Sequence, residues 1–167
     1  MDLGNPDMFS VGTSGPVGDR LFLLHFSEGQ IHATVKVEKQ QVSVLATYLG
    51  RIVRQLGRPG HLPDELDFDV EVEPDWVVGT IGVSYDEDDD RLVVIVEEAG
   101  EDGAVARIAI TREQAAAFAI RATGLVEAGR PPCPLCGFPL EPAGHDCPRT
   151  NGHRPPATWP SARRRTC

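Results

Sequence analysis

The sequence predicts an α+β fold in which a strand-strand-strand-helix unit occurs twice. Three groups of residues recur in the same order roughly seventy residues apart, as internal repeats do. The first group is Pro-Asp, an aromatic residue and Val-Gly-Thr-x-Gly, and the second is Asp-Arg-Leu leading into an apolar run. The third is a strand that enters a helix, written ATVKVEKQQVSVLA and then ARIAITREQAAAFA. Two such units packed together predict a mostly antiparallel sheet or sandwich with two helices.

The first helix is expected to follow directly from a strand and to end near Gly57, because glycine readily terminates helices. Helical spacing of apolar residues predicts a buried face. That face consists of Val42, Leu45, Leu49, Ile52, Val53 and Leu56.

The second helix has a clearer start. Thr111 and Gln114 form a T-x-x-Q capping box, in which the two side chains satisfy exposed backbone donors. Gly129 and Pro131 are expected to end it. Its predicted buried stripe is Ala115, Phe118, Ala119, Ala122, Leu125 and Val126.

Between the two units, apolar residues alternate with four acids, as in a half-buried strand. The apolar positions are Leu66, Phe68, Val70 and Val72, and the acids are Asp67, Asp69, Glu71 and Glu73. An acidic outer face protects a sheet edge from mispairing. A cation-binding or basic-partner surface is the alternative interpretation.

These patterns divide the chain into five segments. They are a first βββα unit at 6–57, a connector with an acidic-faced strand at 58–73, a second βββα unit at 74–128, a zinc-binding segment at 129–154 and a disordered basic tail at 155–167.

Charge separates the body from the C-terminal part of the chain. Residues 1–128 contain ten basic and 23 acidic residues, a net charge of −13, and residues 129–167 contain six arginines and two acids, a net charge of +4. An acidic body argues against nucleic-acid binding there and leaves the tail as the anion-seeking segment. RNA binding through this tail is therefore kept as an alternative function.

The chain is expected to be cytoplasmic. Its N-terminus has neither the basic start nor the apolar run of a secretory signal, and no apolar stretch is long enough to span a membrane. In a reducing compartment the four cysteines favour a metal site or free thiols over disulfides.

The sequence CPLCGFPLEPAGHDC predicts a structural zinc site. Cys133 and Cys136 form a knuckle in which two thiolates converge on one cation, and His145 and Cys147 complete a Cys₃His set. Four protein ligands leave no open position for water, so the zinc is expected to hold a loop. His153 could replace His145 as the fourth ligand.

Such a loop would present Arg149, Asn151 and Arg154 to a partner. The arginines can form bidentate contacts with carboxylate or phosphate groups. Equally, they could dock the zinc loop against the acidic body. Motifs of the common hydrolases are absent from the sequence, so a non-catalytic binding or scaffold protein is the favoured function.

The sequence HFSEGQIH predicts a hairpin with Glu28-Gly29 as its turn, which pairs His25 with His32 on the face opposite the core. The predicted core face consists of Phe22, Leu24, Phe26, Ile31, Ala33 and Val35. Two adjacent imidazoles could bind a metal or transfer protons. They supply the rival hypothesis, in which an enzyme or small-molecule binder has its site at the seam between the two repeats.

The string GRPPCPLCGFPLEPAGHDCPRTNGHR resembles the C-terminal signature of an uncharacterised actinobacterial family, a domain of unknown function. FSVGT, VEKQQV and AAAFAIRA match as well, so the resemblance covers most of residues 6–154. It implies no particular reaction. Family members tend to be encoded near phosphatase-like and kinase-like proteins, so the resemblance implies a protein partner of that kind.

Overall fold

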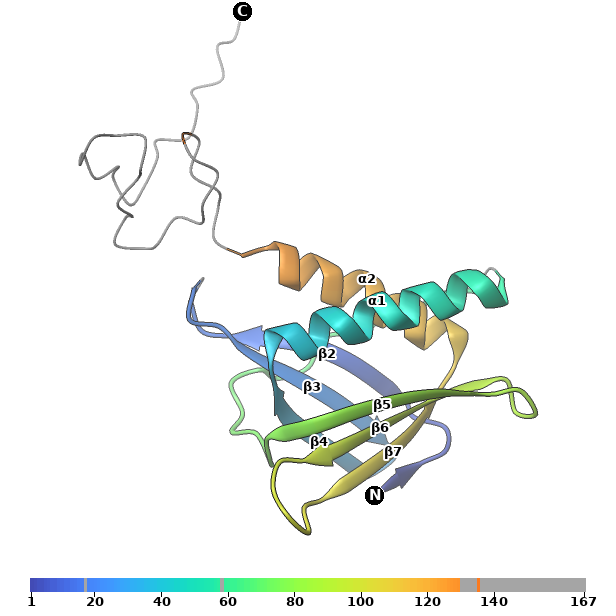
Figure 1. Cartoon of the computed structure of the whole chain (residues 1–167), viewed down its shortest axis with the longest axis horizontal. Coiled ribbons are helices and arrows are strands. Elements are labelled where there is room, and N and C mark those ends of the chain that lie inside the picture. The colour runs from blue at the N-terminus through green and yellow to red at the C-terminus, as the bar shows by residue number, and fades with distance from the viewer. Residues whose placement is uncertain (17, 58, 130–134, 136–167) are drawn as a thin grey trace, which may run out of the picture. The chain divides into compact units, whose positions relative to one another are not determined.

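The computed structural model describes residues 1–16, 18–57, 59–129 and 135. Residues 1–15 and 20–127 form one compact unit, drawn as the coloured ribbon in Figure 1. Its elements in chain order are β1 (Asp2–Leu3), β2 (Met8–Ser14), β3 (Leu21–Glu28), β4 (Ile31–Val37), α1 (Lys39–Leu56), β5 (Val78–Asp86), β6 (Arg91–Glu98), β7 (Val105–Ile110) and α2 (Arg112–Glu127).

The strands form two sheets. One has the order β2-β3-β4 and is antiparallel throughout; the other has the order β1-β7-β6-β5, and within it only β1 pairs in parallel. After β1, the order strand-strand-strand-helix occurs twice, and the two helices pack against each other (Figure 1). The predicted α+β class, with two helices and two mostly antiparallel sheets, is confirmed.

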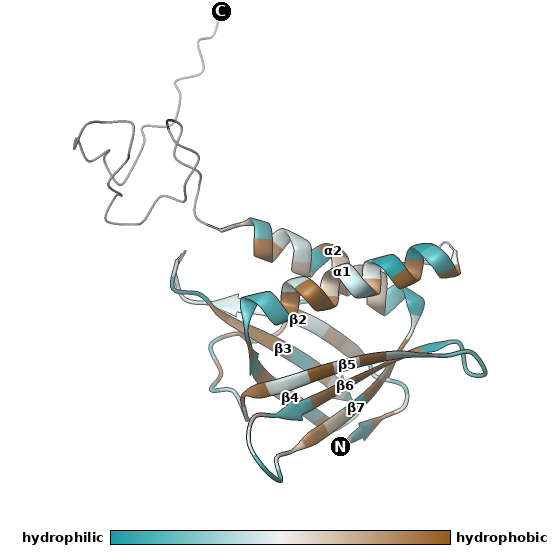
Figure 2. Ribbon diagram, in the orientation of Figure 1, coloured by the Kyte–Doolittle hydropathy of each residue, from teal (hydrophilic) through white to brown (hydrophobic). Residues whose placement is uncertain are grey.

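Both sheets and both helices contribute to one hydrophobic core. Phe9, Phe26 and Phe118 are among its largest fully buried side chains, and removing each from water stabilises the fold by about 1.5–3 kcal/mol. In Figure 2, hydrophobic residues run along the strands and hydrophilic ones gather in the connecting turns. No helix among the described residues combines the length and apolar character needed to cross a membrane.

Residues 75–77 join the two sheets at one edge. Asp75 donates its backbone N–H to the Thr34 carbonyl (2.8 Å), and its carboxylate accepts the Thr34 N–H (2.8 Å). Lys36 then donates its N–H to the Trp76 carbonyl (2.9 Å), and the Val77 carbonyl accepts the N–H of Ala99, which follows β6 (2.8 Å). This edge of β4 is therefore occupied.

Both helices begin at a capping box whose glutamine also binds the other half of the molecule. Gln114 accepts the Thr111 N–H through Oε1 (3.0 Å) and donates from Nε2 to the Pro6 carbonyl (2.6 Å), which confirms the predicted capping box. Gln41 accepts the Glu38 N–H in the same way (2.9 Å) and donates to the Gly79 carbonyl (3.0 Å). The glutamine at the start of each helix therefore donates a hydrogen bond to a backbone carbonyl in the other half.

The β3–β4 hairpin turns one residue later than the sequence predicted. Glu28 pairs with Ile31, so Gly29 and Gln30 form the turn, and His25 lies opposite Thr34 rather than His32. Gly29 has φ +60°, and glycine is favoured at the first central position of a type II′ turn. Because the pairing moves by two positions, the predicted core face is preserved except at Ile31, which is 50% exposed.

The strand ladders also define which positions of the two halves are equivalent. Phe22 pairs with Val37 in the first half, and Leu92 pairs with Ile110 in the second, consistent with the sequence match of the third repeated group. The Val-Gly-Thr groups occupy different ladder positions: Gly12 lies opposite Leu23, in mid-strand, whereas Gly79 lies at an irregularity at the start of β5. The duplication remains a prediction. Its first block does not follow the ladder, and its second is displaced by one position, because Asp-Arg-Leu matches Leu21 with Leu92 whereas the ladder aligns Phe22 with Leu92.

The acidic-faced strand predicted within residues 58–73 does not form, because these residues pair with no described strand. Exposure nevertheless alternates over most of the segment: Leu66, Phe68 and Val70 are half-buried and the acids between them are exposed, but Val72 is exposed as well. The segment lies on the outer face of β2 and β3, where Ser10 Oγ donates to the Leu66 carbonyl (2.5 Å). A sheet face has its backbone groups already paired, so the connector attaches through side chains.

Candidate functional site: a groove between α1 and β5

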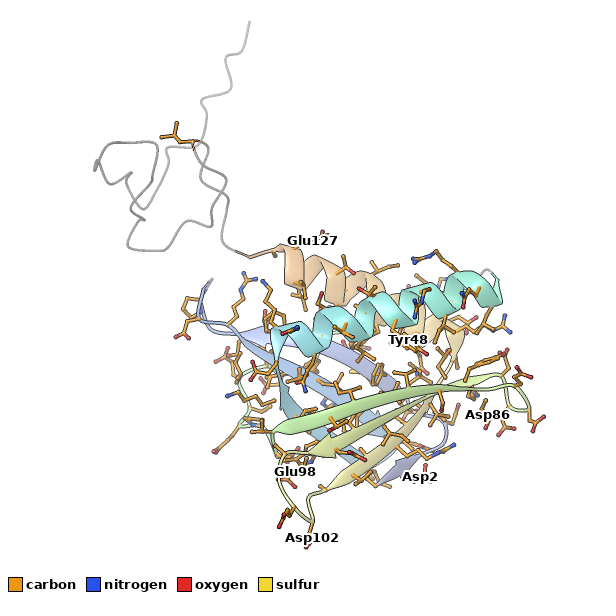
Figure 3. All side chains as sticks on the ribbon, viewed as in Figure 1. Asp2, Tyr48, Asp86, Glu98, Asp102 and Glu127 are labelled. Atoms are coloured by element: carbon orange, nitrogen blue, oxygen red, sulfur yellow. The ribbon has the colours of Figure 1, made fainter. Side chains whose placement is uncertain are left out.

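A groove of about 570 Å³ runs between α1 and β5. It lies at the seam between the two predicted repeats, because α1 ends the first and β5 begins the second. Figure 3 shows Tyr48 on the side of α1 that faces β5. The residues that line it are Glu38, Gln40, Gln41, Val44, Leu45, Tyr48, Ile81 and Val83.

The lining follows from the periods of the two elements. Gln41, Val44 and Tyr48 are three and four residues apart and so share one helix face, and Ile81 and Val83 share one strand face. Val44 is 62% exposed and Tyr48 is 37% exposed, and because they lie one turn apart they form an exposed apolar patch on this helix face. The walls are therefore mainly apolar, and polar side chains from the start of α1 form one end.

The equivalent place in the other half is closed. By ladder register and helix position, Ile81 corresponds to Phe9 and Leu45 to Phe118. Phe9 and Phe118 are fully buried, with ring centroids 4.8 Å apart, so α2 packs directly on β2.

The position equivalent to Tyr48 is Arg121. Arg121 donates from Nε to the Val11 carbonyl on the edge strand β2 (2.6 Å) and forms an ion pair with Asp67 of the connector (2.8 Å). Val11 corresponds to Val83, whose side chain is half-buried in the groove. The contact between helix and edge strand is thus closed by side chains in one half and leaves a groove in the other.

A polar cluster fixes the β5–β6 hairpin to both helices. Arg112 donates to Asp90 (2.8 Å) and to the Leu56 carbonyl at the end of α1 (2.7 Å), and Tyr85 Oη donates to Asp90 (2.7 Å). The bond from Tyr85, followed by that from Arg112, lowers the pKa of the Asp90 carboxyl, and the bond to Asp90 raises the pKa of the Tyr85 phenol. These polar groups are hydrogen-bond partners of one another, so the role of the cluster is to hold the β5–β6 hairpin against the helices.

His25 and His32 lie away from the groove, on the outer face of the β2-β3-β4 sheet. His25 Nδ1 is 2.8 Å from Thr34 Oγ1, and its ring stacks on Phe68 at 4.8 Å. Burial, and then the nearby His32, lower the pKa of His25, and Asp75 partly opposes this. The structure therefore brings the two imidazoles to one face but not to the repeat seam.

In the described part of the chain, no three His, Cys, Asp or Glu side chains are placed to hold a metal ion. The predicted zinc ligands Cys133, Cys136, His145 and Cys147, and the alternative His153, lie outside the described residues. The predicted contact residues are also outside them: Arg149, Asn151 and Arg154.

A family described as proteins of unknown function (DUF3090) matches residues 1–147. The chain belongs to the DUF3090 family. The match spans the whole compact unit and reaches Cys147, so it includes the four predicted zinc ligands but not His153. A comparison with curated proteins gives no match.

The rival hypothesis placed a site at the repeat seam, but sequence reasoning named none of the residues that line this groove, although two signals pointed to them. Val44 and Tyr48 are apolar residues that fall outside the predicted buried stripe of α1. The β5 sequence VGTIGVSYD carries no charge before its last residue. An unguarded apolar strand beside a helix with surplus apolar residues is the pattern that predicts an open groove.

Proposed function

We propose that this DUF3090 protein is a non-catalytic binding protein whose groove between α1 and β5 receives an apolar segment of a partner protein. The observation that carries the proposal is the asymmetry of the halves. Where Phe9, Phe118 and Arg121 seal one side, Ile81 and Tyr48 leave the other accessible.

The chemistry of the lining supports binding rather than catalysis. Glu38 and Tyr48 are the ionisable side chains among the residues that line the groove, and they come from opposite ends of its helical wall. Catalytic sites bring a nucleophile or acid within hydrogen-bond reach of a base. A mainly apolar wall with a polar end is the usual character of a binding site.

A second contact is proposed for the C-terminal segment. Cys133, Cys136, His145 and Cys147 would hold a structural zinc, as their residue types and spacing favour. Arg149 and Arg154 would then reach a carboxylate or phosphate group of the partner.

Metal analysis of the purified chain tests the zinc proposal. We expect about one zinc per chain, and a large loss in Cys136→Ser, because a structural site needs all four ligands. Cys167→Ser is the matched control, since it removes the cysteine outside the motif and should leave zinc unchanged. Less than about half an equivalent in the wild-type chain would contradict the proposal.

A displayed library of random linear peptides, selected on the full chain, tests the groove. Synthetic copies of the enriched peptides are titrated by fluorescence anisotropy. Val44→Asp places a charge in the apolar wall and should weaken binding at least about tenfold. Ile120→Asp is the control, because Ile120 is 65% exposed on α2 and lies outside this groove.

Peptides that bind wild type and Val44→Asp equally would overturn the groove as the binding site. A failure to enrich any peptide, together with specific binding of small apolar molecules by the wild-type groove, would overturn the partner-protein proposal in favour of a small-molecule site.

A further inference from the structure

The backbone of β5 faces the groove with an unpaired edge. β5 is the last strand of its sheet, and α1 runs along its free side (Figure 1). Among the described residues, the backbone groups of residues 80–86 form no hydrogen bond beyond those to β6. Such an edge presents donors and acceptors at the spacing another strand requires.

Two other sheet edges are protected, and the remaining edge strand, β1, has only two residues. The β2 edge has Arg121 on the Val11 carbonyl, and the β4 edge is bridged by Trp76. Proteins usually guard a free edge with lysine, proline or an inward charge. β5 has none of these between Val78 and Tyr85, and its single irregularity lies at its start.

Acidic groups lie at both ends of this edge. Glu38 lines the groove beside the start of α1. At the other end, Figure 3 labels Asp86, where β5 ends. Glu87 and Asp88 follow it, are exposed and form no ion pair with another described residue.

The charge of the whole body adds to this local pattern. Residues 1–128 carry a net charge of −13. A second copy of this chain paired through β5 would bring these acidic ends together and is disfavoured. A partner segment with basic residues on both sides of an apolar centre would be attracted.

We infer that the occupant of the groove is an extended segment that adds to β5 as a further strand. Alternate side chains of the segment are apolar and enter the space between Val44, Tyr48 and Ile81, and lysine or arginine residues flank them. Main-chain hydrogen bonds supply affinity, and the side-chain positions supply specificity. This inference rests on the proposed function, because it specifies what the same groove binds.

The test uses the peptides enriched on the full chain. A set of each peptide is made with one backbone N-methyl group at successive positions. A strand on an edge directs every second N–H toward its neighbour. We therefore expect N-methylation to weaken binding about tenfold or more at alternate positions and to have little effect between them.

Two further measurements accompany the scan. Hydrogen exchange should show that bound peptide slows exchange of amides in residues 80–86, and the same peptide should leave the exchange of Val44→Asp unchanged. Affinity should fall as salt rises, because flanking basic residues of the peptide meet Glu38, Glu87 and Asp88.

Specific outcomes overturn the inference. Peptides that bind the groove with no alternation in the scan, or that become helical on binding, would refute strand addition and leave the proposed binding groove standing. Protection of residues 80–86 that depends on protein concentration without peptide would identify a second copy as the occupant. Peptides that bind Val44→Asp as tightly as wild type would instead refute the groove as the binding site.

Discussion

The two helix-on-strand contacts of this protein have the same construction and opposite outcomes. α2 rests on β2 through Phe118 against Phe9, whereas α1 faces β5 across a groove of about 570 Å³. The difference lies in side chains at equivalent positions. A pair of aromatic rings fills one contact, and a smaller leucine and isoleucine leave the other unfilled.

The comparison separates positions that stabilise the fold from positions available for binding. When two halves share one core, tight packing in one half can stabilise the fold while the other half leaves a strand edge and an apolar surface exposed. The first two pairs of substitutions below compare equivalent positions, and all are given from the largest expected effect to the smallest.

Phe9→Ala should lower the free energy of unfolding by about 3–5 kcal/mol, because it removes a fully buried ring and leaves a cavity. Ile81→Ala, at the equivalent position, should cost less than about 2 kcal/mol, since its side chain already borders the open groove. Urea unfolding followed by circular dichroism measures both. Equal losses would mean that the groove wall is as tightly packed as the sealed contact.

Arg121→Met should cost about 1–3 kcal/mol, because the Val11 carbonyl loses its hydrogen-bond partner while remaining covered by the fold. The ion pair with exposed Asp67 adds at most about 1 kcal/mol. Tyr48→Met, the equivalent change in the open half, should cost at most about 1 kcal/mol, because the ring loses only its cation–π contact with Arg51 (5.1 Å to the ring centroid). A larger loss at Tyr48 than at Arg121 in the same unfolding experiment would reverse the comparison.

The outer faces of the two sheets provide a second comparison. A Cβ at Gly12 would come within 2.6 Å of Val70 Cγ1 in the connector, so Gly12→Ala should cost about 1–3 kcal/mol. Gly82 lies on the uncovered sheet, where the nearest atom, Ile95 Cβ, is 4.0 Å away. Gly82→Ala should therefore change stability by less than about 0.5 kcal/mol.

A compensating substitution identifies the cause at Gly12. Val70→Ala combined with Gly12→Ala should recover part of the stability that Gly12→Ala loses, as measured by thermal unfolding. If the double variant is as unstable as the sum of the single variants, the clash with the connector is not what destabilises Gly12→Ala.

The smallest expected effect concerns pH. Burial under the connector lowers the pKa of His25 below its unfolded value of about 6.5, so the folded protein favours the neutral ring. Above that value the histidine imposes no penalty. As pH falls below about 6.5, the unfolded chain binds the proton first, and stability decreases until the folded group also titrates.

His25→Gln should therefore reduce the loss of thermal stability between about pH 7.5 and 5.5. His61→Gln is the control, because His61 is highly exposed and is paired with Asp64 in the connector. Identical pH profiles for wild type and His25→Gln would show that the connector does not shift the titration of this ring.

Local features were the ones that sequence patterns predicted well. The Thr111–Gln114 capping box depends on residues three positions apart, and the alternation of Phe22, Leu24 and Phe26 depends on the strand period, so both were recovered. The hairpin turn was misplaced by one residue, because either neighbour of Gly29 could have shared the turn with it. Apart from Ile31, the predicted core face was still correct, because a shift of two positions leaves each residue on the same face of the strand.

Features that depend on distant residues were not predictable in this way. Leu66, Phe68 and Val70 have the period of a strand, but the structure places them on a sheet face whose backbone groups are already paired. His25 and His32 lie on the face opposite the core, as the strand period predicts, but the arrangement of the sheets places that face away from the seam between α1 and β5. Neither result is written in local spacing, because each depends on which surface the chain meets.

By itself, the sequence determined the fold class, the two helices with the capping box of the second, and the acidic charge of residues 1–128. Those properties follow from composition and from contacts between near neighbours. Only the tertiary structure decided that Phe9 meets Phe118 while Ile81 and Tyr48 border open space. The physical reason is packing: whether a helix seals a strand depends on the combined volume of side chains brought together from distant parts of the chain.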